Sequence, residues 1–150
     1  MGTRCNIHFN RGKDLRSNIY VHSDGDPESV LGELLTFFRL LKAEVPDNRL
    51  NSPEQLAAKF LVWKSQDMTK YSVRCEFNEE GDYAPVEPTH YLQFLGVSPC
   101  IRDHGDIEYM YEVDCDKFDD EGFPIVRWKT AAKGARFKTV KLGRKGTEAA

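Results

Sequence analysis

The chain has 150 residues, of which 40% are hydrophobic and 11% aromatic. This composition supports one hydrophobic core and excludes an intrinsically disordered protein. The net charge of −3 gives no general attraction to nucleic acid or to an anionic membrane. We expect a cytoplasmic protein, because the sequence contains neither a signal-peptide core nor the apolar run of about 18 residues that a membrane span requires.

The N-terminal part predicts a β-hairpin. In residues 3–10 apolar and polar side chains alternate, which is typical of a half-buried strand. Residues 17–23 alternate in the same way, with Tyr20 and His22 on one face. The short polar connection at residues 11–16 favours antiparallel pairing of the two strands.

Two amphipathic helices are expected next. In residues 27–44 apolar side chains recur every three or four positions. Asp26 suits the N-cap of this helix, and Pro27 suits its first position. Ser52 and Pro53 mark the start of a second helix in the same way.

Strands and loops are predicted for the following part of the chain. Residues 70–77 alternate and predict a third strand, and residues 78–88 predict a loop because Gly and Pro interrupt them. Residues 89–100 are expected to hold a short strand. Residues 106–115 and 124–130 predict a second hairpin.

The C-terminal part differs in being strongly basic. Phe137, Val140 and Leu142 fit a last edge strand. We therefore divide the chain into an α+β domain, residues 1–132, and a basic C-terminal edge strand or tail, residues 133–150. The order of elements predicts a mainly antiparallel sheet with two helices packed on one face.

The positions of the cysteines in the sequence indicate core residues more than a disulfide or a metal site. They form no closely spaced pair, so we expect reduced thiols and no zinc site of the usual spacing. Two of them lie in alternating strand patterns and are expected to be small core residues: Cys5 and Cys75.

Candidate ligand residues gather between the second strand and the first helix. If residues 18–24 are extended, Tyr20, His22 and Asp24 project from one face, and we take these three as ligand-binding residues. His22, Asp24 and Asp26 also suit a divalent ion such as Mg²⁺, Mn²⁺ or Zn²⁺, which could activate water. The structural alternative assigns the carboxylates to a turn and a helix cap, and leaves Tyr20 and His22 unexplained.

Two other polar clusters are interpreted as connections. Residues 112–122 lack the ligand order of a calcium loop and predict a solvated hairpin loop, with docking of a basic partner as the alternative. In residues 102–106, His104 lies between two aspartates beside a Gly, which predicts a turn. We assign no catalytic residue, because spacing alone identifies no nucleophile–histidine–acid triad and the chain has no glycine-rich phosphate loop.

The basic segment is the candidate for contact with nucleic acid. Lys138, Lys141 and Arg144 could neutralise phosphates, and Phe137 could stack on a base. The alternative, which we prefer, is that lysines protect an edge strand against unwanted pairing.

Several short motifs are similar to those of small bacteriophage and prophage proteins of unknown function. Those proteins open with Thr-Arg and an alternating strand, like residues 2–9, and continue with Tyr-x-His-x-Asp-Gly-x-Pro, like residues 20–27. They also carry a Glu-Tyr-x-Tyr strand, like residues 108–111, and a later Trp, like Trp128. The chain departs at Ser23, where those proteins have Trp. The resemblance implies a phage-encoded accessory protein in the bacterial cytoplasm.

The sequence leaves three candidate functions. We favour an accessory protein that binds a host protein or sequesters a small signalling ligand, for instance to counter host defence, without catalysis and without a cofactor. The second is a metal-dependent hydrolase that uses His22 and Asp24. The third is nucleic-acid binding through residues 133–145. We expect no membrane partner, and we leave self-association into a homo-oligomer open.

Overall fold

The computed structural model describes residues 2–69, 73–77, 79–81, 83–88 and 95–145. Its strands are β1 (Cys5–Arg11), β2 (Asp14–Val21), β3 (Val73–Phe77), β4 (Tyr83–Pro88), β5 (Val97–Pro99), β6 (Tyr109–Phe118), β7 (Pro124–Thr130) and β8 (Lys138–Val140). Its helices are α1 (Pro27–Glu44), α2 (Pro53–Thr69) and α3 (Leu142–Lys145).

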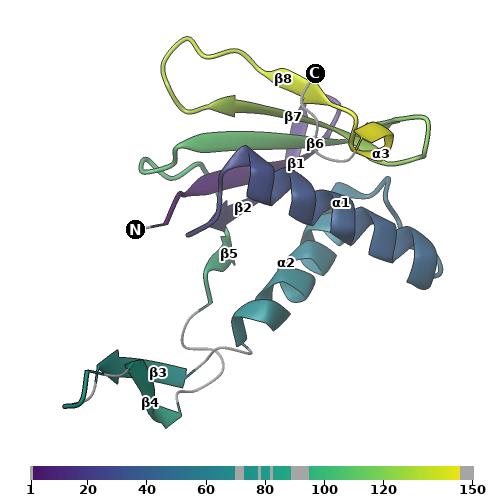
Figure 1. Ribbon diagram of the computed structural model, residues 1–150. Helices are drawn as coiled ribbons and strands as arrows, with labels where there is room; N and C mark the ends of the chain where they lie inside the picture. The colour runs from purple at the N-terminus through teal and green to yellow at the C-terminus, as the bar shows by residue number, and fades with distance from the viewer. Residues whose placement is uncertain (1, 70–72, 78, 82, 89–94, 146–150) are drawn as a thin grey trace.

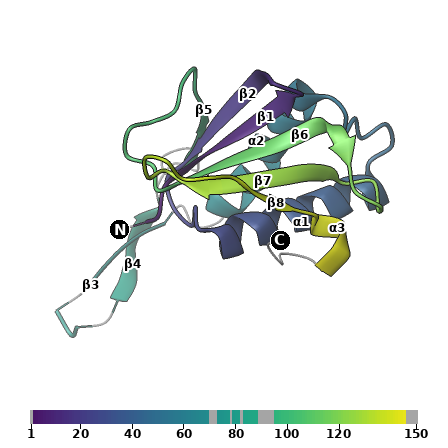
Figure 2. The same ribbon diagram turned by 90° about the horizontal axis from the view of Figure 1, so that it is seen from above.

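Six strands form the main sheet, in the order β5-β2-β1-β6-β7-β8, and β3 pairs with β4 in a separate small sheet. Figure 1 shows α1 and α2 on one side of the main sheet, and Figure 2 shows the same arrangement from above. The predicted α+β fold with two helices on one face is therefore confirmed. One pair, β1 with β6, is parallel, and the other pairs are antiparallel.

The predicted first hairpin and both predicted helix starts are confirmed. β1 and β2 join through a tight turn in which Gly12 has a positive φ of 60°, a conformation that glycine adopts without strain. Asp26 caps α1 by accepting a hydrogen bond from the backbone N–H of Ser29 at 3.1 Å, and Pro27 opens the helix. α2 begins at Pro53.

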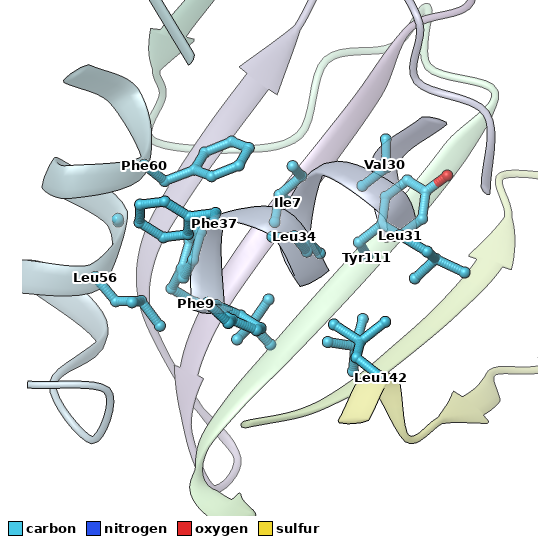
Figure 3. Packing of buried hydrophobic residues seen from close by; sticks show 14 of the residues in the cluster. Ile7, Phe9, Val30, Leu31, Leu34, Phe37, Leu56, Phe60, Tyr111 and Leu142 are labelled. Atoms are coloured by element: carbon cyan, nitrogen blue, oxygen red, sulfur yellow. The ribbon is translucent and has the colours of Figure 1, made fainter. Parts of the chain in front are cut away.

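The core lies between the sheet and the two long helices. Figure 3 shows α1, α2, β1 and β6 contributing side chains to it, with Leu142 of α3 closing one end. Aromatic rings join the two helices, since the ring of Phe37 meets the ring of Phe60 at 5.3 Å between centroids. Burial of such rings is the main source of stability in a domain of this size.

The junction between β2 and α1 is held by close backbone contacts. A Cβ atom at Gly25 would lie 2.9 Å from the Cβ of Cys5, so only glycine permits this approach. The N–H of Gly25 donates to the carbonyl of Thr3 at 3.0 Å, and the buried hydroxyl of Tyr111 donates to the carbonyl of Gly25 at 2.6 Å. These contacts fix the direction in which α1 leaves the sheet.

The segment predicted to be a loop at residues 78–88 instead contains β4. Gly81 and the prolines favour a loop, but β4 pairs with β3, and no other described strand pairs with β4. An edge strand tolerates proline, because no partner needs the missing N–H. Within the predicted third strand at residues 70–77, residues 73–77 form β3 in this small sheet with β4; residues 70–72 and 78 lie outside the described residues.

Other boundaries also differ from the prediction. The strand expected at residues 106–115 runs from Tyr109 to Phe118, and its hairpin with β7 is confirmed. β5 confirms a short strand within residues 89–100, of which residues 89–94 lie outside the described part. Leu142 belongs to α3 and not to the last strand, because its side chain turns into the core. β8 pairs with β7, so residues 138–140 of the basic segment form an edge strand of the main sheet.

Candidate functional site

The face of the sheet opposite to the helices carries polar side chains on β1 and β2. Along β1 they alternate with core residues, as the sequence predicted. They are not solvated, however: Asn6 is fully buried, and three more are nearly so. These are His8, Asn10 and Asn18. Three of these four residues, Asn6, His8 and Asn18, bond to the segment that connects β5 to β6, and we call residues 100–108 the covering loop. The buried Oδ1 of Asn10 has no hydrogen-bond partner among the described residues.

A hydrogen-bond network joins this loop to the two strands. Asp103 accepts hydrogen bonds from His8 Nε2 at 2.6 Å and from Asn18 Nδ2 at 3.0 Å. Asn6 donates to Asn18 Oδ1 at 2.9 Å and accepts from the backbone N–H of His104 at 3.0 Å. Buried polar groups require such partners, so the network is a condition for burying this face.

A second group of contacts surrounds Tyr20. Its ring stacks on the ring of His104 at 3.7 Å between centroids, and the ring of His22 meets its edge at 4.6 Å. The Tyr20 hydroxyl donates to Asp106 at 3.0 Å, and Arg4 Nε lies 3.4 Å from the same carboxylate. Tyr20 is therefore covered, with only 2% of its surface exposed.

The backbone anchors the loop at both ends. The N–H of Cys100 donates to the carbonyl of Asn18 at 2.9 Å, and the N–H of Glu108 donates to the carbonyl of Arg4 at 2.9 Å. Between these anchors Ile101 is 95% exposed. The arrangement presents an isoleucine to solvent from a loop that is held at its start, middle and end.

Burial raises the pKa of two groups on this face, Tyr20 and Cys100. Burial raises the pKa of Tyr20, and the hydrogen bond to Asp106 raises it further. Burial also raises the pKa of the Cys100 thiol, although the hydrogen bond from Asn6 to its sulfur opposes this. A thiol in this state is a weak nucleophile, because the thiolate is the reactive form. The arrangement is suited to holding the loop in place.

The other described cysteines behave as core residues. Cys5 and Cys115 are fully buried free thiols, and burial raises the pKa of each to about 12. The prediction that Cys5 is a core residue is confirmed. The side chain of Cys75 lies outside the described part of the chain.

The predicted ligand residues are only partly brought together. Tyr20 and His22 are in contact, and His22 is exposed. The expectation that residues 18–24 are extended is wrong beyond Val21, where β2 ends. Asp24 has a φ of 56°, a left-handed conformation that aspartate accepts in turns, so the alternation that would place it on the face of Tyr20 is broken.

The carboxylate of Asp26 has the structural role that the cap alternative gave it, since it accepts from both the N–H and the hydroxyl of Ser29. Within the described residues, no group of three or more His, Cys, Asp or Glu side chains is placed to hold a metal ion. Metal binding by His22, Asp24 and Asp26 stays a prediction.

The predicted nucleic-acid residues lie at the edge of the main sheet. Lys138 Nζ is 4.8 Å from the ring centroid of Trp128. The ring of Phe137 lies between two cations of β7, Arg127 and Lys129. Lys141 lines a small pocket with three acidic residues of the connection between β6 and β7, so acidic side chains lie close to this lysine. Arg144 is in α3, and its side chain lies outside the described residues.

Sequence reasoning missed most of the covered face. The sequence predicts a plain turn at His104 and its two aspartates, and a strand at β1 that is buried on one face only. One signal was available: asparagine is disfavoured in strands, yet β1 and β2 contain three. What those asparagines bind could not be read from the sequence, because Asp103 is 95 residues from His8 along the chain.

Comparison with protein-family models, with curated proteins and with solved structures found no match. Among the described helices, none is long and apolar enough to cross a membrane. The function is therefore inferred from the geometry of the covering loop and its anchors.

Proposed function

We propose that this protein is a non-catalytic accessory protein, of the kind that bacteriophages encode, and that it binds a host protein through the covering loop. Its place of action would be the bacterial cytoplasm, where such binding could counter host defence. The observation that carries the proposal is the exposure of Ile101 on a loop anchored by buried hydrogen bonds.

A single exposed apolar residue is common on protein surfaces. Ile101 differs because the backbone around it is already ordered by Asp103, by His104 and by the Cys100 amide. A loop that is ordered before binding loses little conformational entropy when a partner docks. Ile101 can then fill an apolar pocket of the partner, with the exposed guanidinium of Arg102 beside it.

A host protein suits this geometry better than a small ligand does. Tyr20 is one of the three predicted ligand-binding residues, and in the structure the ring of His104 covers it. The loop presents one highly exposed apolar side chain, Ile101, whereas small-molecule sites are concave pockets. The hydrolase and nucleic-acid hypotheses stay predictions.

The test is affinity capture from bacterial lysate with mass spectrometry of the recovered proteins. The wild-type protein should recover a specific host protein, and Ile101→Asp should lose it. Leu15→Asp is the matched control, because Leu15 is an exposed apolar residue at the other end of β2 from the loop. Circular dichroism should show that both variants are folded.

Two results would overturn the proposal. One is equal recovery of the same protein by wild type, Ile101→Asp and Leu15→Asp. The other is recovery of no specific protein by the wild type. Asp103→Ala adds a finer measurement: it keeps Ile101 but removes the acceptor of His8 and Asn18, so the partner should bind several-fold more weakly.

A further inference from the structure

The outer edges of the two sheets are protected to different degrees. β5 and β8 are three-residue edge strands; β5 ends at Pro99, and β8 begins at Lys138. β4 contains Pro85 and Pro88, and its register with β3 skips Val86, so the bulge lies on β4. Short length, proline, lysine and bulges all discourage the addition of another strand.

β3 has none of these protections. It is five residues long, contains no proline, and advances regularly past the bulge of its partner. Within the described part of the chain, only β4 pairs with it. Its outer edge therefore presents unpaired backbone N–H and C=O groups to another strand.

The position of this edge makes it accessible. Figures 1 and 2 both show β3 and β4 standing away from the main sheet and from α1. A two-stranded hairpin by itself is at best marginally stable in water, and additional strands stabilise it. A strand from another molecule could approach β3 without displacing any described element of the fold.

The sequence of β3 is complementary to itself. In an antiparallel pair of two copies centred on Cys75, position 73 faces position 77 and position 74 faces position 76. Val73 is then opposite Phe77, and Arg74 is opposite Glu76, on both sides of the centre. Apolar and opposite-charge pairs are favourable across strands. Parallel pairing in register would instead place Arg74 opposite Arg74 and Glu76 opposite Glu76.

We propose that β3 pairs antiparallel with β3 of a second copy of this chain, which forms a four-stranded sheet in the order β4-β3-β3-β4 across a two-fold axis at Cys75. Such a contact is isologous and closed, so it ends at a dimer. A ladder of five residues is small beside the roughly 1,200 Å² that stable interfaces bury, so the dimer dissociates on dilution. This proposal does not depend on the covering loop.

Charge reversal tests the pairing by sedimentation equilibrium over a range of protein concentrations. Arg74→Glu places Glu opposite Glu at both positions and should raise the dimer dissociation constant at least ten-fold, and Glu76→Arg should do the same. The double variant Arg74→Glu with Glu76→Arg exchanges the charges and should restore the wild-type constant. This rescue separates pairing from misfolding, because each single change is present in the double variant.

Cysteine cross-linking tests the register. Cys75 would face its own copy across the axis, so treatment with a copper(II)–phenanthroline oxidant should give a disulfide-linked dimer. Residues directly opposite in antiparallel strands have Cβ atoms about 4.5–5.5 Å apart, close to the separation in a disulfide. Cys75→Ser should abolish the cross-linked dimer, and Cys100→Ser should leave it unchanged.

The proposal fails if the wild type is monomeric at every concentration measured, if single charge reversals leave the dissociation constant unchanged, or if the cross-link survives Cys75→Ser. If β3 pairs with a strand of another protein and not with a second copy, this chain alone should sediment as a monomer. That result would also overturn the proposal. Ile101→Asp should dimerise like the wild type, so failure here and failure of host-protein binding are distinguishable.

Discussion

At the scale of single residues, the polar side of β1 shows how one buried contact requires the next. Asn6 can be fully buried only because Asn18 and the amide of His104 satisfy its side chain. Asn18 in turn shares Asp103 with His8. Removing one member leaves a buried partner without its hydrogen bond, which costs more than the bond itself contributes.

His8→Ala should therefore lower the free energy of unfolding by about 1–3 kcal/mol. The variant should also speed hydrogen exchange at the His104 amide, because the loop loses an anchor. Chemical denaturation and exchange measured by NMR or mass spectrometry check the two effects. Arg16→Ala is the control, since its pair with Glu54 is exposed and should contribute roughly 0–1 kcal/mol. Equal effects of the two variants would contradict a buried network.

At the scale of elements, the start of α1 decides what the acidic corner does. Asp26 caps the helix, and Gly25 brings the preceding backbone against Cys5. This junction sets the end of β2 at Val21 and so breaks the extended face that the sequence predicted for Asp24. The helix cap and the close backbone contact together end the extended conformation, although the alternating sequence pattern continues beyond Val21.

Two substitutions at Asp26 separate capping from metal binding. Asp26→Ala should lower the free energy of unfolding by about 1 kcal/mol. Asp26→Asn should change it by no more than about a few tenths of a kcal/mol, because asparagine is an equally good cap. Thermal unfolding with and without Mn²⁺ or Zn²⁺ gives the second readout. If Asp26 only caps the helix, neither ion should raise the melting temperature of the wild type more than it raises that of Asp26→Asn. A metal-dependent increase confined to the wild type would support the metal site.

At the scale of the whole molecule, one core joins both long helices to the main sheet. Phe60 of α2 is fully buried beside Phe37 of α1 and Phe9 of β1. Trp63 packs against this cluster, and Trp128 of β7 packs against the same core beside Tyr109. Because the core is continuous, the main sheet and its helices should unfold in one cooperative transition.

Phe60→Ala should lower the free energy of unfolding by about 3–5 kcal/mol, because it leaves a cavity in this core. Val62→Ala is the control in the same helix: Val62 is 61% exposed and its truncation should change stability by less than about 0.5 kcal/mol. Tryptophan fluorescence and far-UV circular dichroism should report the same midpoint for each variant. Two separate midpoints would show that the core is divided.

The amino-acid sequence determined the features that depend on neighbouring residues. The bounds of α1, the start of α2 and the pairing of β1 with β2 follow from capping residues, periodicity and a short turn. Tertiary structure alone decided that β1 pairs in parallel with β6, that β4 is a strand despite its prolines, and that Asp103 meets His8. Those outcomes depend on contacts between residues far apart in the chain, for which local patterns carry no information.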